Sequence, residues 1–446
     1  MQQAVVFAGL LALGVLSAAF YFLDVPVATW LGMDPLTCHS AVVAALFAFY
    51  LVAFWLVRRR LPSTPRVVAV ILGFALLFRS LMLMTPVYLS SDVYRYLWDG
   101  RVQWAGHNPY RYPPDAVELR ALRDPAFHPQ INRPASVTAY PPGAQWLFAL
   151  AAYSAPGSIP GWRLLLLGMD GGTLWVLLRL LIRVGAPGSA ILIYAWSPLV
   201  VFEGVQAGHV DLAMILFVLL ALMARLDHSS VGAGVLLGIA VLIKMYPALL
   251  VAAWWRRQDW RFPAAVGATV ALGYLPYAAT LGIGSLGFLP SYFLDRREDF
   301  NLGLRALVNW LLGLSAEVPR RLIIVLLLVV VATVLAWIGR THARGCCDTW
   351  QAAALAIGAW LVLGPFSVHP WYVLWMIPFL CVRPSPAWLY FSGAVVLYYT
   401  EYLNPSGALP WWAWLGEYGP LYVLLVTGAR RRAMPPAATS LAVRRT

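Results

Sequence analysis

Two carboxylates stand in one short polar stretch, Ser90 to Arg101, where the chain is predicted to leave a membrane, and this pattern favours a catalytic interpretation. In a helix, Asp92, Tyr96 and Asp99 recur at steps of four and three residues and therefore share one face. Asp92 is the candidate general base, because a carboxylate next to an acceptor hydroxyl can take up its proton. The pattern also fits an amphipathic helix at a membrane surface, with its aromatic rings at the depth of the lipid headgroups.

Lys244 is the single lysine of the chain and stands in an apolar run. An ionisable side chain at membrane depth is costly, so it is a functional candidate. It could be a fixed cation for an anionic substrate group, or it could form a structural salt bridge with a buried acid such as Asp170 or Asp211. His369 and Tyr372 stand beside a proline between two later apolar runs. They could face a cavity and bind phosphate, or they could belong to an interfacial aromatic belt.

Further polar residues stand at the ends of apolar runs on the same predicted side of the membrane. His209 and Asp211 would end one span, either as site residues or by satisfying free backbone groups of the helix end. Arg163 follows a Pro-Gly turn and Arg305 lies in a later external segment, where each could bind the substrate or a lipid headgroup. Asp99 would orient an arginine or the acceptor. These residues complete the predicted substrate-binding set.

The composition predicts a membrane protein. Hydrophobic residues make up 61% of the 446 residues and charged residues only 11%, whereas a soluble domain carries about 25% charged residues. The apolar residues form blocks of about 17–25, each long enough to cross a bilayer as a helix. We therefore interpret the net charge of +13 as membrane topology and contact with lipid headgroups, not as a nucleic-acid surface. The four cysteines lack the spacing of metal ligands.

The arginines orient the predicted spans, because excess arginine gathers in cytoplasmic loops. The basic loop at residues 58–66 places both ends of the chain in the cytoplasm and Asp92 on the extracytoplasmic side. We expect an all-α polytopic protein with about twelve crossings. Residues 85–142 would form a large extracytoplasmic loop that carries juxtamembrane helices, and residues 281–314 a second external segment. Residues 231–255 are predicted to break near Lys244 into two half-helices, which keeps the following arginines inside.

These expectations divide the chain into three parts. Residues 1–66 would hold two N-terminal transmembrane helices and the basic loop, and residues 67–432 a transmembrane catalytic domain. Residues 433–446 would form a disordered cytoplasmic tail. Within the second part, residues 189–205, 373–382 and 388–403 are each predicted to cross the membrane once.

Short motifs along the chain resemble those of the GT-C superfamily of membrane glycosyltransferases, which use polyprenyl-phosphate sugars. The motifs begin with the SDVYRYLWDG stretch that contains Asp92. The others are Gly106/Asn108/Pro109/Tyr110, Tyr140-Pro141-Pro142, Gly208-His209-Val210-Asp211, Gly238-Ile239-Ala240 before Lys244, and His369-Pro370-Trp371-Tyr372. Within the superfamily, the chain is similar to bacterial mannosyltransferases of glycosyltransferase family 87 and to related glycolipid mannosyltransferases. The resemblance covers most of the chain from about residue 67 onward.

This resemblance implies a GT-C-like fold and an inverting transfer of a sugar, commonly mannose, from a polyprenyl-phosphate donor. Asp92 would be the base, and His369 would contact the donor phosphate. The first loop lacks the Asp-x-Asp pair that accompanies metal use in some relatives, so neither a metal nor another cofactor is expected. The partners would be the donor, a glycolipid or glycan acceptor and membrane lipids. The enzyme would lie in the plasma membrane with its site on the extracytoplasmic face.

Two other classes of function stay open at this point. A transporter or flippase of a lipid-linked sugar would also need a cationic cavity and broken helices, but the chain shows no matching pair of interrupted spans. A non-catalytic membrane scaffold would explain neither Lys244 nor the acids Asp92 and Asp99. The sequence thus predicts a membrane glycosyltransferase and leaves its sugar and its acceptor unnamed.

Overall fold

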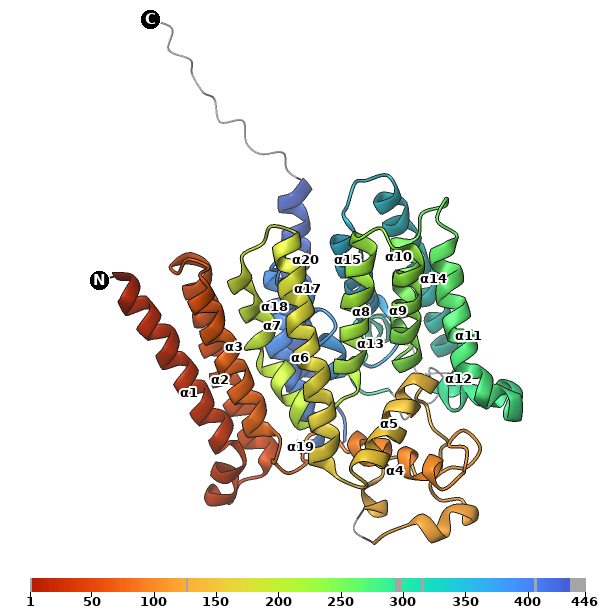
Figure 1. The fold of residues 1–446 in the computed structure, drawn as a ribbon. Helices are drawn as coiled ribbons and strands as arrows, with labels where there is room; N and C mark the ends of the chain where they lie inside the picture. The colour runs from red at the N-terminus through yellow and green to blue at the C-terminus, as the bar shows by residue number, and fades with distance from the viewer. Residues whose placement is uncertain (1, 126, 293–298, 314–316, 405–406, 434–446) are drawn as a thin grey trace, which may run out of the picture.

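The long helices of the computed structural model lie side by side, and the segment of residues 85–142, which is predicted to be external, gathers at one end of them around α4 and α5 (Figure 1). The model describes the chain except residues 1, 126, 293–298, 314–316, 405–406 and 434–446. Every regular element in the described part of the chain is helical. The start of α1 and the end of α20 both lie at the end opposite α4 (Figure 1). The tail predicted to be disordered, apart from its first residue, lies outside the described residues.

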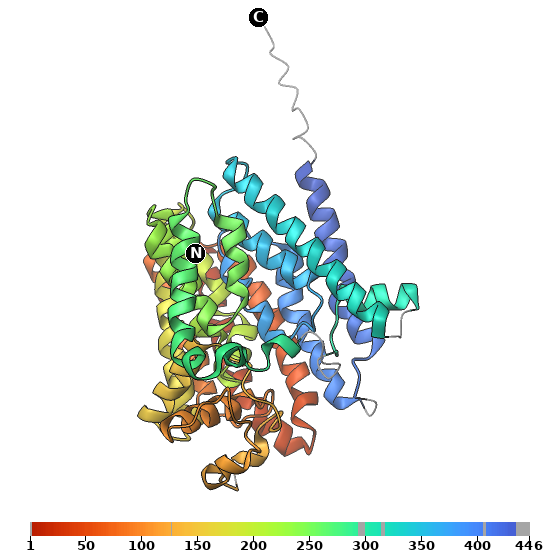
Figure 2. The same cartoon turned by 90° about the vertical axis from the view of Figure 1, so that its right-hand side faces the viewer.

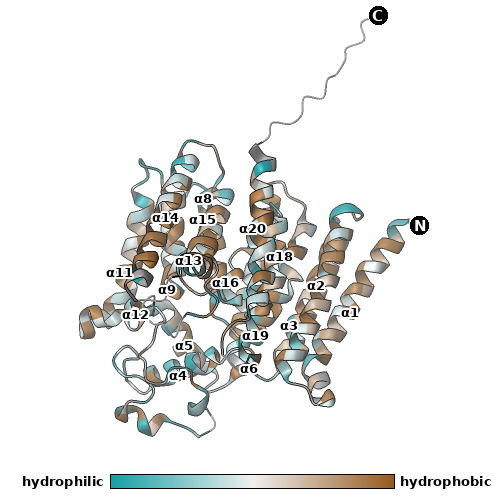
Figure 3. Ribbon diagram, turned by 180° about the vertical axis from the view of Figure 1, so that it is seen from behind, coloured by the Kyte–Doolittle hydropathy of each residue, from teal (hydrophilic) through white to brown (hydrophobic). Residues whose placement is uncertain are grey.

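Within the described residues, six helical stretches are long and apolar enough to cross a membrane. Five lie in α1 (Gln2–Leu31), α2 (Pro35–Arg59), α3 (Pro65–Met82), α6 (Ile159–Arg183) and α14 (Glu317–Ala343), and the sixth starts with α11 (Arg261–Leu281) and continues to Tyr292. Their residues are mostly hydrophobic, and hydrophilic residues gather at the helix ends and around α4 (Figure 3). One bent pair of helices adds a seventh span if it crosses as a unit. The described residues therefore do not reproduce the predicted count of about twelve crossings.

The remaining elements are shorter. In the first half of the chain they are α4 (Asp92–Trp104), η1 (Val117–Leu122), η2 (His128–Gln130), α5 (Pro142–Ser154), η3 (Gly188–Ile191), α7 (Leu192–Ala195), η4 (Val200–Gln206) and α8 (Asp211–Leu226). They continue with α9 (Ser230–Ile243), η5 (Tyr246–Ala248), α10 (Leu249–Trp254), η6 (Gly282–Leu286), α12 (Leu289–Tyr292), α13 (Leu304–Leu312) and α15 (Thr349–Leu363). The last are α16 (Pro370–Val373), α17 (Ile377–Leu380), α18 (Pro386–Ala394), η8 (Val395–Tyr399), α19 (Thr400–Leu403) and α20 (Trp411–Ala433).

Three of the predicted single spans are broken in the structure, which corrects those predictions. Residues 189–205 bend by 62° between α7 and the π-helix η4, at Pro198, which has no backbone N–H to donate. Residues 373–382 contain the end of α16 and the four-residue helix α17. Residues 388–403 are divided among α18, η8 and α19. Each break places irregular backbone inside the bundle, where other parts of the protein can surround it.

The predicted break in residues 231–255 is confirmed. α9 ends at Ile243, Lys244 is extended, and α10 starts at Leu249. The guanidinium of Arg225, at the end of α8, donates to the carbonyl of Trp254 over 2.9 Å. The chain therefore turns at Lys244 and returns to the end of the molecule from which α9 started.

A buried ion pair joins α3 to α6. Arg79 Nε lies 2.5 Å from Asp170 Oδ2, and the hydroxyl of Tyr194 donates to the other oxygen of Asp170 over 2.5 Å. A second guanidinium nitrogen of Arg79 donates to the carbonyl of Ala195 over 2.7 Å. All these groups are buried, and a buried charged or polar group without a partner costs free energy. Each group therefore depends on the others for its hydrogen bonds or its opposite charge. This pairing removes Asp170 as the partner of Lys244.

The external segment is fixed to the bundle by α4 and α5, which pack closely against each other. At Gly100 in α4, a β-carbon would lie 2.2 Å from the carbonyl oxygen of Phe148 in α5. One turn earlier, the ring of Tyr96 stacks on the ring of Phe148, with centroids 4.7 Å apart. Figure 2 shows the external segment below the ends of the long helices. The start of α4 thus has a defined position beneath the bundle.

Candidate active site

A cavity of about 880 Å³ lies at the start of α4. Four of the predicted site residues line it: Asp92, Lys244, His369 and Tyr372. They come from the start of α4, the break after α9, the loop before α16, and α16 itself. The fold therefore brings distant parts of the sequence into one cavity of the size that ligand sites usually have.

Asp92 is the first residue of α4 and is held by side-chain donors. Its Oδ1 accepts a hydrogen bond from Asn132 Nδ2 over 2.6 Å. Its Oδ2 accepts from the hydroxyls of Tyr140, over 3.1 Å, and Tyr96, over 3.4 Å. The side chain is still 16% exposed. The carboxylate is therefore held in one orientation and can meet a substrate in the cavity.

Two of these donors, Asn132 and Tyr140, were missed as site residues by the sequence reasoning. Tyr140 opens the Tyr-Pro-Pro motif, which was used only as support for the family resemblance. The sequence therefore did hold a signal for this residue. Asn132 lies in an irregular part of the outer loop and carries no local signal. Its role appears only when the loop is folded against α4.

His209 lies behind Asp92 and between two acids. Its Nδ1 is 3.8 Å from Asp92 Oδ2, and its Nε2 is 3.4 Å from Glu203 Oε2. Burial, followed by the charge of Lys244, lowers the pKa of His209, so the ring is neutral. Its ring stacks on that of Trp371, with centroids 4.1 Å apart. The buried Glu203, in η4, was not predicted as a site residue.

Lys244 forms an ion pair and also faces the cavity. Its Nζ lies 2.6 Å from Asp211 Oδ2, while the indole N–H of Trp375 donates to Asp211 Oδ1 over 2.7 Å. The ammonium group also lies 5.2 Å from the ring centroid of Tyr372. Asp211 is thus a structural partner, as the sequence reasoning allowed. The lysine side chain remains 13% exposed and lines the cavity.

His369 and Tyr372 complete the wall near Lys244. His369 Nδ1 lies 3.1 Å from the hydroxyl of Tyr398, and the hydroxyls of Tyr372 and Tyr292 are 2.9 Å apart. Burial and the charge of Lys244 lower the pKa of His369 to about 3. At neutral pH the ring can offer one N–H as a hydrogen-bond donor, but it carries no positive charge.

Six residues predicted to bind the substrate do not line the cavity. Tyr96 and His209 lie next to Asp92, and Asp211 pairs with Lys244. Protein groups hold the other three elsewhere. Asp99 accepts hydrogen bonds from Arg95 and Gln145, over 2.8 and 3.0 Å, so it orients an arginine, as one of its two predicted roles required. Arg163 donates to backbone carbonyls of the loop after α3, including that of Thr85 over 2.6 Å. Arg305 forms hydrogen bonds of 3.0 and 2.7 Å with the carboxylate of Asp299.

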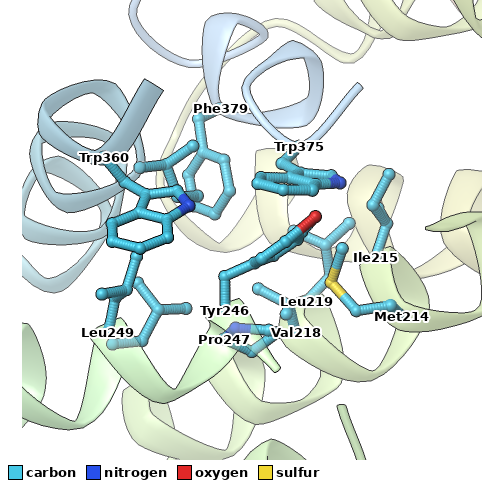
Figure 4. Close-up of a pocket in the computed structure, with 12 residues that line it drawn as sticks. Met214, Ile215, Val218, Leu219, Tyr246, Pro247, Leu249, Trp360, Trp375 and Phe379 are labelled. Carbon is cyan, nitrogen blue, oxygen red and sulfur yellow. The ribbon is translucent and has the colours of Figure 1, made fainter. Parts of the chain in front are cut away.

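A second, apolar pocket of about 20 Å³ adjoins the cavity. Figure 4 shows the ring of Tyr246 beneath that of Trp375, with Trp360 and Phe379 to the left of these two rings. Tyr246, Leu249 and Trp360 line both spaces. The cavity thus has an apolar extension that starts next to Lys244.

Comparison with known families identifies the N-terminal part of the chain. The sequence model described as "Alpha-(1->6)-mannopyranosyltransferase, N-terminal domain" matches residues 1–258. The match starts at residue 1 and includes Asp92, His209, Asp211 and Lys244, so it extends further toward the N-terminus than the resemblance noted in the sequence. No curated protein matches the chain. Because the match covers more than half of the 446 residues, the chain belongs to the MptA_B family of mannosyltransferases.

Proposed function

We propose that the protein transfers mannose, with inversion, from a polyprenyl-phosphate donor to a hydroxyl of a glycolipid or glycan on the extracytoplasmic face of the plasma membrane. The observation that carries this proposal is that a carboxylate, Asp92, and an ammonium group, Lys244, line one cavity. Transfer from a phosphate-linked sugar needs both a base and a cation.

Asp92 is the base of the proposed reaction. As the acceptor oxygen attacks C1 of the mannose, its proton passes to the Asp92 carboxylate and a new C1–O bond forms. The bond between C1 and the phosphate oxygen breaks at the same time, on the opposite face of C1. The electron pair leaves with the polyprenyl phosphate, and the configuration at C1 inverts.

Lys244 is the cation that stabilises the leaving phosphate. A fixed positive charge in a site of low dielectric stabilises developing negative charge more strongly than it would in water. His369 would add an uncharged N–H donor, and the hydroxyls of Tyr372 and Tyr292 two more. The first part of the polyprenyl chain would lie against apolar side chains that line the cavity near Lys244, among them Leu249 and Trp360.

The proposed orientation in the membrane follows from the arginines. Arg58 and Arg59 close α2, at the end of the molecule opposite α4. Arg225 marks the same end through its contact with Trp254. Excess arginine is typical of the cytoplasmic side, so the cavity would face outward.

The test is a transfer assay on purified protein in nanodiscs, with labelled polyprenyl-phosphate mannose and octyl α-mannoside. Asp92→Asn keeps the shape of the side chain and removes the base, so its kcat should fall by about 10²–10⁴-fold. Asp115→Asn is the control, because that acid is 48% exposed on the outer loop and its variant should transfer normally. The proposal fails if the wild type consumes no donor or if Asp92→Asn matches it. Movement of intact donor across the bilayer without transfer would support the flippase alternative.

A further inference from the structure

One wall of the cavity has no assigned ligand under the proposed function. The wall near Lys244 would hold the donor phosphate. Another wall is formed by α19, the start of α2 and the loop before α4, and it includes Glu401, Tyr402, Leu36 and Tyr88. α19 packs against α2, which brings these segments together. Figure 3 shows α19 near the lower ends of α2 and α3.

Glu401 is an acid without a partner on this second wall. It is only 8% exposed and lines the cavity. Its Oε2 is buried and accepts no hydrogen bond from any described residue. A buried carboxyl oxygen without a donor costs free energy, so its position in a cavity points to a ligand that brings the donor. Carboxyl oxygens accept hydrogen bonds from hydroxyl groups.

Two aromatic rings that line the cavity with Glu401 are held in place by polar contacts. The hydroxyl of Tyr88 donates to Asp24 in α1 and lies 3.1 Å from His39 Nδ1 in α2. The hydroxyls of Tyr402 and Tyr398 are 3.2 Å apart. A sugar ring has apolar C–H faces and polar edges. Aromatic rings next to a hydrogen-bond acceptor are the surfaces that suit such a ligand.

The negative charge of Glu401 determines which substrate its wall of the cavity can bind. Burial raises the pKa of Glu401 to about 7, so at pH 8, where the test is made, most of these carboxyl groups are ionised. A second anion close to Glu401 would then be repelled, so the donor phosphate is favoured on the wall of Lys244. Asp92 faces the same cavity as Glu401 and can therefore meet a hydroxyl of a ligand bound there. Resting on the proposed function, we propose that Glu401, Tyr88 and Tyr402 form the acceptor subsite, and that Glu401 recognises an uncharged sugar by accepting hydrogen bonds from its ring hydroxyls.

The test compares the wild type with Glu401→Gln, which keeps the shape of the side chain and removes its charge. Octyl α-mannoside is the uncharged acceptor, and octyl glucuronide, an anionic analogue, is the probe of charge selection. Because hydrogen bonds to a charged group are the stronger ones, the KM for octyl mannoside should rise about tenfold or more in the variant. The Kd for the donor should stay unchanged. The wild type should reject the glucuronide, and the variant should accept it better.

Glu118→Gln is the matched control, because Glu118 is exposed on the outer loop and its variant should keep the wild-type KM. An unchanged donor Kd also shows that Glu401→Gln is folded. The inference is overturned if the variant transfers mannose with the wild-type KM for octyl mannoside. It is also overturned if the wild type uses the glucuronide equally well. The proposed function fails in a different way: the wild type then consumes no donor, or Asp92→Asn transfers mannose as well as the wild type does.

Discussion

Lys244 has two roles that one pair of substitutions can separate. In Lys244→Met, the ammonium group is lost and the fully buried carboxylate of Asp211 keeps only the indole N–H of Trp375. Removing one partner of a buried ion pair costs about 3–5 kcal/mol. Adding Asp211→Asn removes the stranded charge, and the side-chain oxygen of the new asparagine can still accept from Trp375. The double variant should therefore regain most of the stability that the single variant loses.

Donor affinity should behave differently from stability. A hydrogen bond to a charged group contributes about 1.5–3 kcal/mol, and about 1.4 kcal/mol corresponds to a factor of ten in Kd. Loss of the contact between Lys244 and the donor phosphate should therefore weaken donor binding about 10–100-fold. The double variant has no cation to replace the lysine, so its donor affinity should stay at least about tenfold below that of the wild type.

The assay measures both properties on the same preparations in nanodiscs. The unfolding temperature reports stability, and titration with fluorescent polyprenyl-phosphate mannose at constant salt reports the donor Kd. Asp211→Asn alone is the control, because it keeps the cation and should retain donor binding. If the double variant binds the donor as tightly as the wild type does, Lys244 is only the structural partner of Asp211. The proposed phosphate contact would then be refuted.

Two further predictions concern charge and packing. Because burial lowers the pKa of His369 to about 3, the folded protein takes up no proton at His369 near the ordinary value of 6.5, and this residue should add no step to the pH dependence of donor affinity between about pH 5.5 and 8. Donor titrations of the wild type and His369→Gln check this; affinity that rises as the pH falls through 6.5 in the wild type alone would contradict it. Gly100→Ala should destabilise the protein by about 1–3 kcal/mol, because a β-carbon would lie 2.2 Å from the Phe148 carbonyl. Thermal unfolding checks this against Gly73→Ala, where no atom lies within 4 Å, and equal unfolding temperatures would exclude the close contact.

Features with a local chemical cause were predictable from the sequence. The break at Lys244 follows from a lysine and a proline in an apolar run that is flanked by arginines, and the structure confirms it. The position of Asp92 at the start of a helix follows from the polar stretch after the third apolar run. In both cases the residues that cause the structure are neighbours in sequence.

Only part of the α4 face that was predicted to hold Asp92, Tyr96 and Asp99 reaches the cavity. Asp92 and Tyr96 do meet, at 3.4 Å. Asp99 instead pairs with Arg95 on its own helix and with Gln145 of α5. Only the first turn of α4 reaches the cavity, and helical spacing cannot show where a cavity ends. The partners Asn132 and Glu203 were missed because their positions depend on how distant segments pack.

The predicted count of about twelve crossings was not reproduced, for a different reason. Hydropathy identifies apolar segments, but it does not distinguish a segment that faces lipid from one that is surrounded by protein. All seven residues of η4 are buried in the structure. Such segments can break and bend, because neighbouring parts of the protein can form hydrogen bonds with the backbone groups that a break leaves free. Hydropathy alone therefore does not fix the number of crossings.

The two N-terminal helices stabilise the cavity as well as the bundle. Tyr88 lines the cavity next to the acceptor wall, and its hydroxyl finds its partners in Asp24 of α1 and His39 of α2. A buried phenol without such partners would be costly in a membrane protein. The first two helices therefore contribute contacts that hold a residue of the cavity wall in place.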